Sequence, residues 1–154
     1  MSNLEKIPVT ILTGFLGAGK TTLIRNLIIK NKSKRLAVII NEFGDLGVDG
    51  EIVKQCSDAT CPEENILELA NGCICCTVAD DFVPTMQTLL DGKYLPEHIL
   101  IETSGLALPK PLLKAFEWPE IRSKLTVDSV LAVVDAEAVV NGVFAPQMSS
   151  EIEN

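Results

Sequence analysis

The feature that most constrains the fold of this chain is a glycine-rich segment, GFLGAGKT, at residues 14–21. The segment satisfies the phosphate-loop pattern G-x-x-x-x-G-K-[ST] at every fixed position. An apolar, β-branched run at residues 7–13 precedes it and predicts a buried strand. Residues 20–30 follow with apolar side chains at the spacing of one helix face, namely Leu23, Leu27 and Ile28. A strand, a glycine-rich turn and a helix in this order are the context in which such a loop binds phosphate.

The residue types in this loop suit a nucleoside triphosphate. Glycines allow the backbone to curl so that successive N–H groups face a phosphate, and the helix start adds the positive end of its dipole. Lys20 is expected to neutralise the β- and γ-phosphates, and the Thr21 hydroxyl to ligate Mg²⁺. The residues predicted to bind the nucleotide are Gly14, Gly17, Ala18, Gly19, Lys20, Thr21, Thr22 and Gly105.

Two acidic segments follow predicted strands and are candidates for contacts to the metal ion and the γ-phosphate. The sequence ETSG at residues 102–105 comes directly after an apolar run, so Glu102 is placed to hold Mg²⁺ or orient a water, and the Gly105 N–H to bind the γ-phosphate. Glu42 lies in the segment NEFGD, which ends another predicted strand. The predicted catalytic residues are therefore Lys20, Glu42 and Glu102, and the predicted Mg²⁺ ligands are Thr21, Glu42 and Glu102.

Three thiols, those of Cys73, Cys75 and Cys76, lie close together in the chain. The first two point the same way in an extended stretch, and a helix that starts at Thr77 provides a turn that brings in the third. The helix N-terminus also favours the thiolate forms. Three thiolates without a nearby histidine suit Zn²⁺ or a similar ion, with a fourth position left to water, another residue or a partner.

Other interpretations of the cysteines stay open at this stage. The three thiols are alternatively small buried apolar groups or a redox pair. Cys56 and Cys61 lie nearby in the sequence and are candidates to complete a structural zinc site, although their spacing is loose. His98, the one histidine of the chain, precedes a predicted core strand and is expected to be a packed or surface residue rather than a ligand.

Strand and helix patterns alternate along the chain, which predicts an α/β fold: a parallel sheet flanked by helices on both faces, within one phosphate-loop domain over residues 1–154. The run Val130–Val134 is apolar enough for an interior strand, yet little chain follows to cover it. The further elements expected are strands at 36–41, 66–69, 98–101 and 126–134, helices from 77, at 109–116 and at 135–144, and a long functional loop at 42–65.

Charge and hydropathy exclude two classes of partner. The formal net charge of −8 and the pI near 4.6 leave no basic face for a general nucleic-acid binder. No uncharged apolar run approaches the ~20 residues of a membrane span. Five clustered cysteines are an odd number and do not form a disulfide framework, so a reducing, cytoplasmic location is expected.

Taken together, these motifs resemble the CobW-type metal-handling GTPases, relatives of the nickel-insertion GTPases of hydrogenase and urease. The resemblance rests on GFLGAGKTT, NEFGDLGVDG, NGCICCT and ETSG, and it runs across nearly the whole chain. It implies a SIMIBI-like phosphate-loop domain in which Lys20, Thr21 and Glu102 serve Mg²⁺–GTP and Glu42 belongs to the first switch. It also implies that Cys73, Cys75 and Cys76 hold a cargo ion, Zn²⁺ or Co²⁺.

By the same resemblance, slow GTP hydrolysis is coupled to holding and delivering the metal. The expected partners are a metal-acceptor protein or a cobalt chelatase of cobalamin biosynthesis, and a homodimer is an open expectation. The Asn-Lys-x-Asp base-reading motif and the second domain of the family are missing from these residues. A truncated domain is therefore expected, with guanine specificity resting on the resemblance alone.

Two other functions compete with this interpretation. A phosphate-loop kinase acting on a small molecule would have a basic or aromatic substrate pocket and no need for thiols, whereas aromatic residues make up only 5% of the chain. A non-catalytic zinc-binding module would bind metal with the same affinity whichever nucleotide is present.

Overall fold

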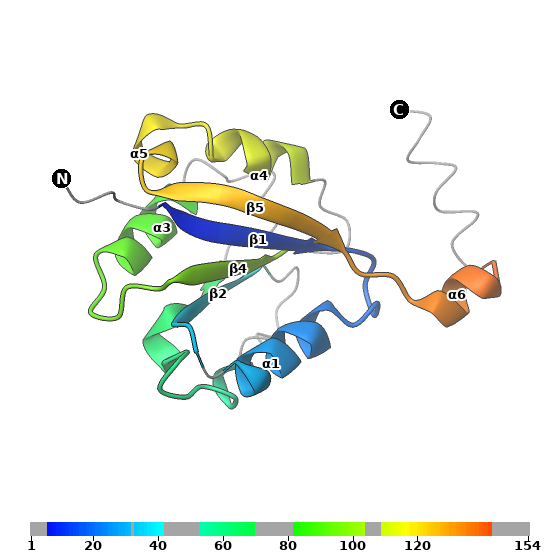
Figure 1. The fold of residues 1–154 in the computed structure, drawn as a ribbon. Coiled ribbons are helices and arrows are strands. Elements are labelled where there is room, and N and C mark those ends of the chain that lie inside the picture. Colours follow the sequence, from blue (N-terminus) through cyan, green and yellow to red (C-terminus); the bar gives the residue numbers. More distant parts are fainter. Residues whose placement is uncertain (1–5, 32, 42–52, 70–81, 104–108, 143–154) are drawn as a thin grey trace.

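A five-stranded parallel sheet forms the centre of the computed structural model, which describes residues 6–31, 33–41, 53–69, 82–103 and 109–142 (Figure 1). Each strand pairs in parallel with its neighbours. The order across the sheet is β3-β2-β4-β1-β5, so the chain crosses over between sequential strands. The strands are β1 (Ile7–Thr13), β2 (Leu36–Asn41), β3 (Ile66–Leu69), β4 (His98–Glu102) and β5 (Leu125–Ala132).

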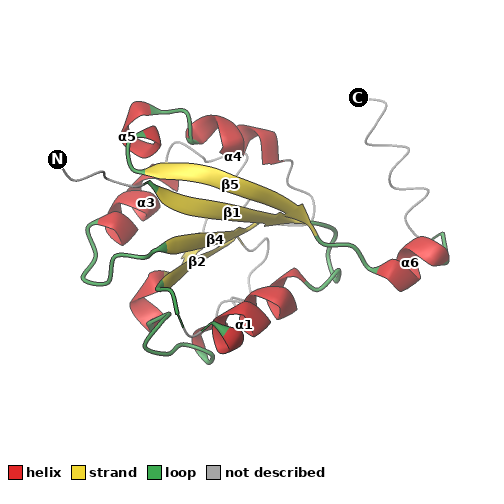
Figure 2. Cartoon of the chain, viewed as in Figure 1, coloured by secondary structure: helices red, strands yellow, loops and turns green. Residues whose placement is uncertain are grey.

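Helices cover both faces of the sheet, which confirms the predicted parallel α/β architecture (Figures 1 and 2). One face packs against α1 (Lys20–Lys30), and the other against α3 (Val83–Leu90), α4 (Pro109–Ala115) and α5 (Pro119–Arg122). The short α5 was not expected from the sequence. The last helix, α6 (Ala136–Val140), lies within the expected range 135–144, begins at a cap made by Asp135, and has no buried residue. It projects away from the sheet in Figure 1.

Successive side chains of each strand point to opposite faces of the sheet, and this builds two separate hydrophobic cores. In β1, Val9 and Ile11 belong to the cluster under α3, α4 and α5, whereas Leu12 belongs to the cluster under α1. The neighbouring β4 divides in the same way, with Ile99 on the first face and Leu100 on the second. Burial on both faces explains why these strands are almost continuously apolar in sequence.

The apolar stripe of α1 differs from the predicted one. Ile24 and Ile28 are fully buried, while Leu27 is 38% exposed. The third buried residue of this helix is Lys20, which precedes Ile24 by one helical repeat. Because Lys20 must face the phosphate loop, the buried side of the helix is the row of residues four apart that starts there. Of the three residues whose spacing predicted this helix, Ile28 is buried, Leu23 packs partly buried against the same core, and Leu27 is the exposed one.

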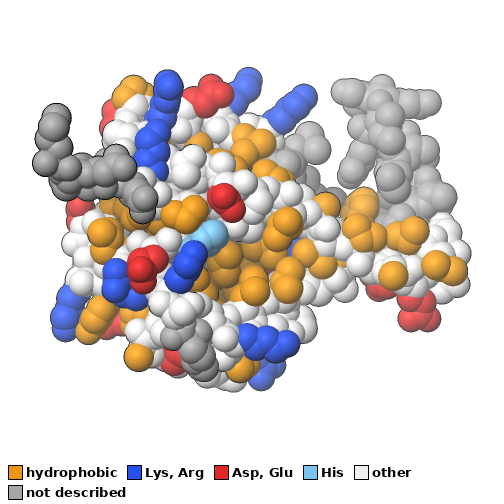
Figure 3. Space-filling view, in the orientation of Figure 1, with side chains coloured by type: hydrophobic (Ala, Val, Ile, Leu, Met, Phe, Trp, Pro, Cys, Tyr) orange, Lys and Arg blue, Asp and Glu red, His pale blue; other side chains and the backbone are white. Residues whose placement is uncertain are grey.

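The position of β5 also departs from expectation. Instead of an interior strand, it is an edge strand of the described sheet, and Val130 and Leu131 are 42% and 45% exposed. A register shift opposite Val9 and Thr10 interrupts its pairing with β1. Figure 3 shows hydrophobic side chains gathered over the strands on this side of the molecule.

The expected long loop contains ordered, buried structure in the part that is described. A 3-10 helix, η1, covers Glu63–Asn65, and both Val53 and Cys61 pack into the core beside α1. The predicted start of a helix at Thr77 lies outside the described residues. Three apolar residues at the start and along α3 face the core, namely Phe82, Met86 and Leu89.

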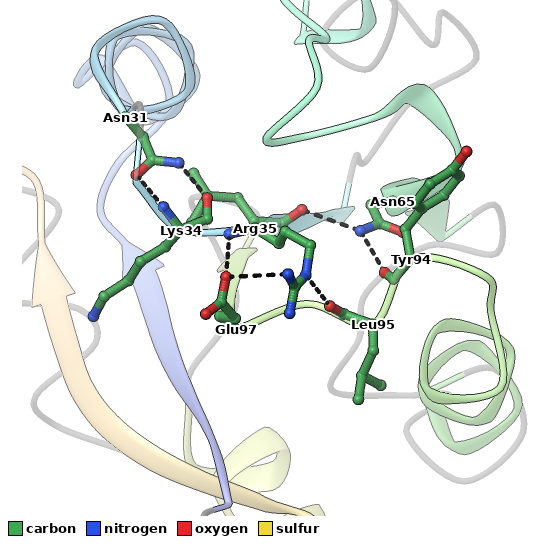
Figure 4. A network of polar contacts seen from close by, with 8 residues as sticks. Asn31, Lys34, Arg35, Asn65, Tyr94, Leu95 and Glu97 are labelled. Carbon is green, nitrogen blue, oxygen red and sulfur yellow. Dashed lines mark hydrogen bonds and ion pairs between the residues drawn. The ribbon is translucent and has the colours of Figure 1, made fainter.

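Polar side chains hold the ends of the sheet's elements together where β2 and β4 begin (Figure 4). The amide of Asn65, buried to 3% exposure, donates to the carbonyls of Leu36 at 3.3 Å and Tyr94 at 2.9 Å. On the outside of this network, the Arg35 guanidinium donates to the Leu95 carbonyl at 2.9 Å and lies 3.7 Å from the Glu97 carboxylate. The Arg35–Glu97 pair is half exposed and contributes little, so Asn65 is the main polar tie here.

We therefore expect Asn65→Ala to lower the free energy of unfolding by about 1–3 kcal/mol, because two hydrogen bonds in a buried setting are lost. Asn26→Ala, on the exposed side of α1, is the matched control and should change it by less than about 0.5 kcal/mol. Urea denaturation followed by circular dichroism measures both. Equal stabilities of the two variants would show that the Asn65 contacts carry no net stabilisation.

Candidate functional site

Sheet topology brings two predicted site segments together. Strands β1 and β4 pair in parallel with Leu12 opposite Glu102, so the loop after β1 and the end of β4 emerge side by side. The chain leaves β1 through α1 to reach β2, which lies on the far side of β4. Such a crossover opens a crevice at the carboxyl ends of the strands, where ligands of α/β proteins bind.

The phosphate-loop backbone adopts conformations that favour glycine. Gly14, Gly17 and Gly19 have φ of 138°, 79° and 97°. Gly19 caps α1 and has no side chain that could accept from the first amides of that helix. A helix start of this kind suits an anion, because its N–H groups and the helix dipole favour negative charge.

Position 14 also requires glycine because the backbone at Val133 lies too close to leave room for a side chain. A Cβ placed on Gly14 would lie 2.2 Å from the carbonyl oxygen of Val133. The Val133 N–H in turn donates to the Thr13 carbonyl at 2.8 Å. The chain leaving β5 is thus packed against the base of the loop, a contact that the sequence pattern did not predict.

Lys20 lies inside the loop rather than in solvent. Its side chain is 5% exposed, and Nζ donates to the carbonyl oxygens of Gly14 at 2.9 Å and Phe15 at 3.2 Å. These two acceptors hold the ammonium group within the curl of the glycine-rich backbone. A cation fixed there is positioned to contact phosphate oxygens bound by the loop amides.

Thr21 and Glu102 meet across 81 residues of sequence. The Thr21 hydroxyl donates to the Glu102 carboxylate, at 3.0 Å to Oε1 and 3.2 Å to Oε2, and Glu102 is only 6% exposed. A hydroxyl and a carboxylate side by side are the hard oxygen donors that Mg²⁺ prefers, together with phosphate oxygens and water. The described residues therefore fit the ion that the loop pattern implies.

The residue after Glu102 anchors this arrangement and was not singled out from the sequence. Thr103 is fully buried, and both its N–H and its hydroxyl donate to the Leu12 carbonyl, at 2.9 Å and 3.0 Å. The sequence does place a threonine directly after Glu102 at the end of a predicted strand. It could not show that this threonine bonds to Leu12, because that contact depends on the order of strands in the sheet.

The remaining predicted site residues divide into two groups. Thr22 is exposed on the first turn of α1, and Ala18 donates its N–H to the Phe15 carbonyl at 3.1 Å within the loop. Five others lie outside the described residues, so their predicted roles are untested: Glu42, Cys73, Cys75, Cys76 and Gly105. Among the described residues, no three His, Cys, Asp or Glu side chains gather in a way that could hold a metal ion.

Cys61 has the properties of a core residue. It is fully buried, and burial, with a smaller contribution from the Asp58 carboxylate, raises its pKa from an ordinary 9.0 to about 12. Asp58 accepts from the Cys61 N–H at 3.0 Å within a tight turn. Within the part of the chain that the structure describes, no third potential ligand gathers with Cys61 and Cys56 to form a metal site.

The raised pKa of Cys61 predicts a loss of stability at alkaline pH. Above about pH 9 the unfolded thiol ionises while the folded thiol stays protonated up to about pH 12, so the unfolded state is favoured as the pH rises. Urea titrations of the wild type and Cys61→Ala at pH 8 and pH 10 measure this. The wild type should lose more stability between the two pH values than the variant; parallel losses would contradict the assignment.

His98 is a partly buried packing residue in this structure. Its Nε2 forms a 2.9 Å hydrogen bond with the hydroxyl of Thr10, which also contacts the Ser129 hydroxyl at 3.0 Å. Burial, and then the nearby charge of Lys34, lower the pKa of His98. These residues lie on the face of the sheet that carries α1, at the start of β4 and away from the phosphate loop.

No helix within the described ranges has the length and apolar character needed to cross a membrane.

Comparison with known proteins assigns these features to a family. Residues 8–154 match the family model described as CobW/HypB/UreG, nucleotide-binding domain. This range contains the phosphate loop, both acidic segments and the three clustered cysteines.

Curated relatives are similar at high identity. The zinc chaperone CobW of a Sinorhizobium species is 62% identical over 144 residues, and that of Pseudomonas aeruginosa is 58% identical over 148 residues; both alignments cover 94% of this chain. The zinc chaperone YjiA of Escherichia coli is 38% identical over 138 residues, or 86% of this chain. The chain spans 40–42% of the length of these relatives.

A solved structure shows the same fold. The crystal structure of Zn(II)-bound YjiA GTPase from Escherichia coli matches with a TM-score of 0.60 at 28% sequence identity, covering 90% of this chain and 43% of that chain.

Proposed function

Since the chain belongs to the CobW/HypB/UreG family of nucleotide-binding domains, we propose that it binds Mg²⁺–GTP, hydrolyses it slowly, and uses this cycle to hold and release Zn²⁺. The observation that carries the nucleotide half of the proposal is the convergence of Lys20, Thr21 and Glu102 at the ends of β1 and β4. Guanine is proposed as the base because relatives are named as GTPases.

The chain's own residues account for binding and charge stabilisation. Loop amides and the start of α1 face the phosphates, and Lys20 compensates the charge on the β- and γ-phosphates. Thr21 and Glu102 would hold Mg²⁺, which would supply neutralisation of the charge on the departing diphosphate. Attack by water forms the new O–P bond in line with the breaking bond between the γ-phosphorus and the β-γ bridging oxygen. Glu42 or Glu102 is proposed to position that water or the ion.

The metal half of the proposal places the cargo on Cys73, Cys75 and Cys76. Zn²⁺ suits three thiolates, and relatives named as zinc chaperones support this choice. Gly105 is proposed to bind the γ-phosphate, so that loss of this group releases the chain after β4. The cysteines lie in sequence between Glu42 and Glu102, so a change in either segment can alter the metal site.

Finer parts of the proposal concern the destination of the metal. Cobalt supply to a chelatase of cobalamin biosynthesis is one such destination, but thiolate sites bind Zn²⁺ more tightly than Co²⁺, so availability or contact with the acceptor would have to select cobalt. We propose that a metal-acceptor protein receives the ion and that the chain works in a reducing cytoplasm. A homodimer would form around the nucleotide or the thiols.

The test is a measurement of Zn²⁺ and Co²⁺ affinity by chelator competition, in parallel with Mg²⁺–GTP and Mg²⁺–GDP. A tenfold difference between the two nucleotides corresponds to ~1.4 kcal/mol of coupling and supports a GTP-gated carrier. Equal affinities, with binding of both nucleotides verified, would refute the coupling and leave a zinc-binding module.

Replacing Cys73, Cys75 and Cys76 together by serine should weaken Zn²⁺ binding by at least about a hundredfold while GTP turnover stays within about twofold, because hard hydroxyls replace the thiolates. Cys56→Ser is the matched control and should retain the wild-type Zn²⁺ affinity. If Cys56→Ser weakens binding as much as the triple variant, the proposed ligand set is wrong.

A further inference from the structure

Thr103 makes a doubled contact with the strand that leads into the phosphate loop. Its backbone N–H and its hydroxyl both donate to one acceptor, the Leu12 carbonyl, at 2.9 Å and 3.0 Å. Thr103 itself is fully buried. The N–H contact alone would satisfy that carbonyl in the way usual for parallel strands, so the hydroxyl adds a second donor to a group already paired.

The place of this contact in the fold gives it a consequence for the site. Leu12 lies opposite Glu102 in the sheet register and two residues before Gly14. On the other side of β1, the Val133 N–H donates to the Thr13 carbonyl. The last residues before the phosphate loop are therefore held from both neighbouring strands, and on the β4 side the holding residue is the one that directly follows Glu102.

We infer that Thr103 is a positioning residue for nucleotide hydrolysis, whose hydroxyl fixes the end of β4 against β1 and so holds the Glu102 carboxylate at the Thr21 hydroxyl. This inference rests on the proposed function, since it concerns the same reaction. Both donor groups of Thr103 are bonded to the Leu12 carbonyl, so the residue acts through Glu102 and not on the substrate itself. Displacement of a reacting or metal-binding group by a fraction of an ångström is enough to lower a catalytic rate.

Thr103→Val isolates the hydroxyl, because valine keeps the β-branched shape and the strand preference of threonine. We expect kcat for GTP to fall by about tenfold, with KM within about twofold, because binding by the loop amides and Lys20 is unaffected. The Mg²⁺ concentration for half-maximal rate should rise. Thr103→Ser keeps the donor and should retain kcat within about threefold of the wild type.

Thr10→Val is the matched control for a merely structural effect. Thr10 is 7% exposed, lies on β1, and bonds through its hydroxyl to His98 and Ser129 rather than to the site. Both valine variants lose one buried hydroxyl, so their thermal midpoints should fall similarly, while kcat of Thr10→Val should stay within about twofold of the wild type.

Three results would overturn the inference while leaving the proposed function intact, given an active wild type. They are an unchanged kcat in Thr103→Val, an equal loss of kcat in Thr10→Val, and no recovery in Thr103→Ser. A wild-type chain that neither binds nor hydrolyses GTP would instead overturn the proposed function, and the inference with it.

Discussion

Lys20→Ala is expected to lower kcat/KM for GTP hydrolysis by about 10²–10³ or more, because a preorganised donor to the developing phosphate charge is removed from a water-poor site. The ammonium group is already in place, held by the carbonyls of Gly14 and Phe15 and 5% exposed. Steady-state measurement of phosphate release from Mg²⁺–GTP gives kcat/KM for both proteins.

Lys30→Ala is the control for this substitution. Lys30 occupies the last turn of the same helix and is exposed, so its replacement removes an equal charge far from the loop. Turnover within about twofold of the wild type is expected, since exposed charges that far away are screened. If Lys20→Ala keeps kcat/KM within tenfold of the wild type while its fold is intact by circular dichroism, Lys20 does not have the role proposed here.

Gly14→Ala should destabilise the protein by about 2–4 kcal/mol and remove nucleotide binding. Two independent effects combine: a backbone at φ 138° that alanine adopts only with strain, and a Cβ that would lie 2.2 Å from the Val133 carbonyl oxygen. Relief of this overlap requires β1 and the chain after β5 to separate, which disturbs the base of the loop. Thermal unfolding and GTP titration measure the two consequences.

Gly142→Ala is the control that separates the two causes of the stability loss expected for Gly14→Ala, namely the steric overlap and the strained backbone conformation. Gly142 also has a positive φ, of 67°, but a Cβ there would meet no atom within 4 Å. Its replacement should cost about 1 kcal/mol and leave GTP affinity unchanged. If the two alanine variants unfold at the same temperature, the contact with Val133 contributes nothing to stability.

The parts of this fold that could be predicted from the sequence are those determined by local patterns. Strand β1, the loop and α1 are contiguous, and their residue types specify each element almost alone. The spacing of Leu23, Leu27 and Ile28 predicted α1, but the buried row of the helix consists of Lys20, Ile24 and Ile28, which the spacing did not identify.

The contacts that could not be predicted are those set by the order of strands. Thr21 and Glu102 were expected near the same ion, but that they touch follows from the insertion of β4 between β1 and β2. The partners of Thr103 and Gly14 depend on the same order, because Leu12 lies on β1, next to β4, and Val133 directly follows β5, the other neighbour of β1. The edge position of β5 also depends on how all five strands are ordered, so it could not be predicted from the short apolar run Val130–Val134.

The close approach of Gly14 to the Val133 carbonyl has a consequence for how this chain can change over evolutionary time. The approach depends at position 133 on the backbone alone, so many side chains there preserve it, whereas at position 14 every side chain with a Cβ disrupts it. The two residues that share this contact are therefore constrained differently: position 14 must lack a Cβ, whereas position 133 is constrained through its side chain, which packs against the core under α1.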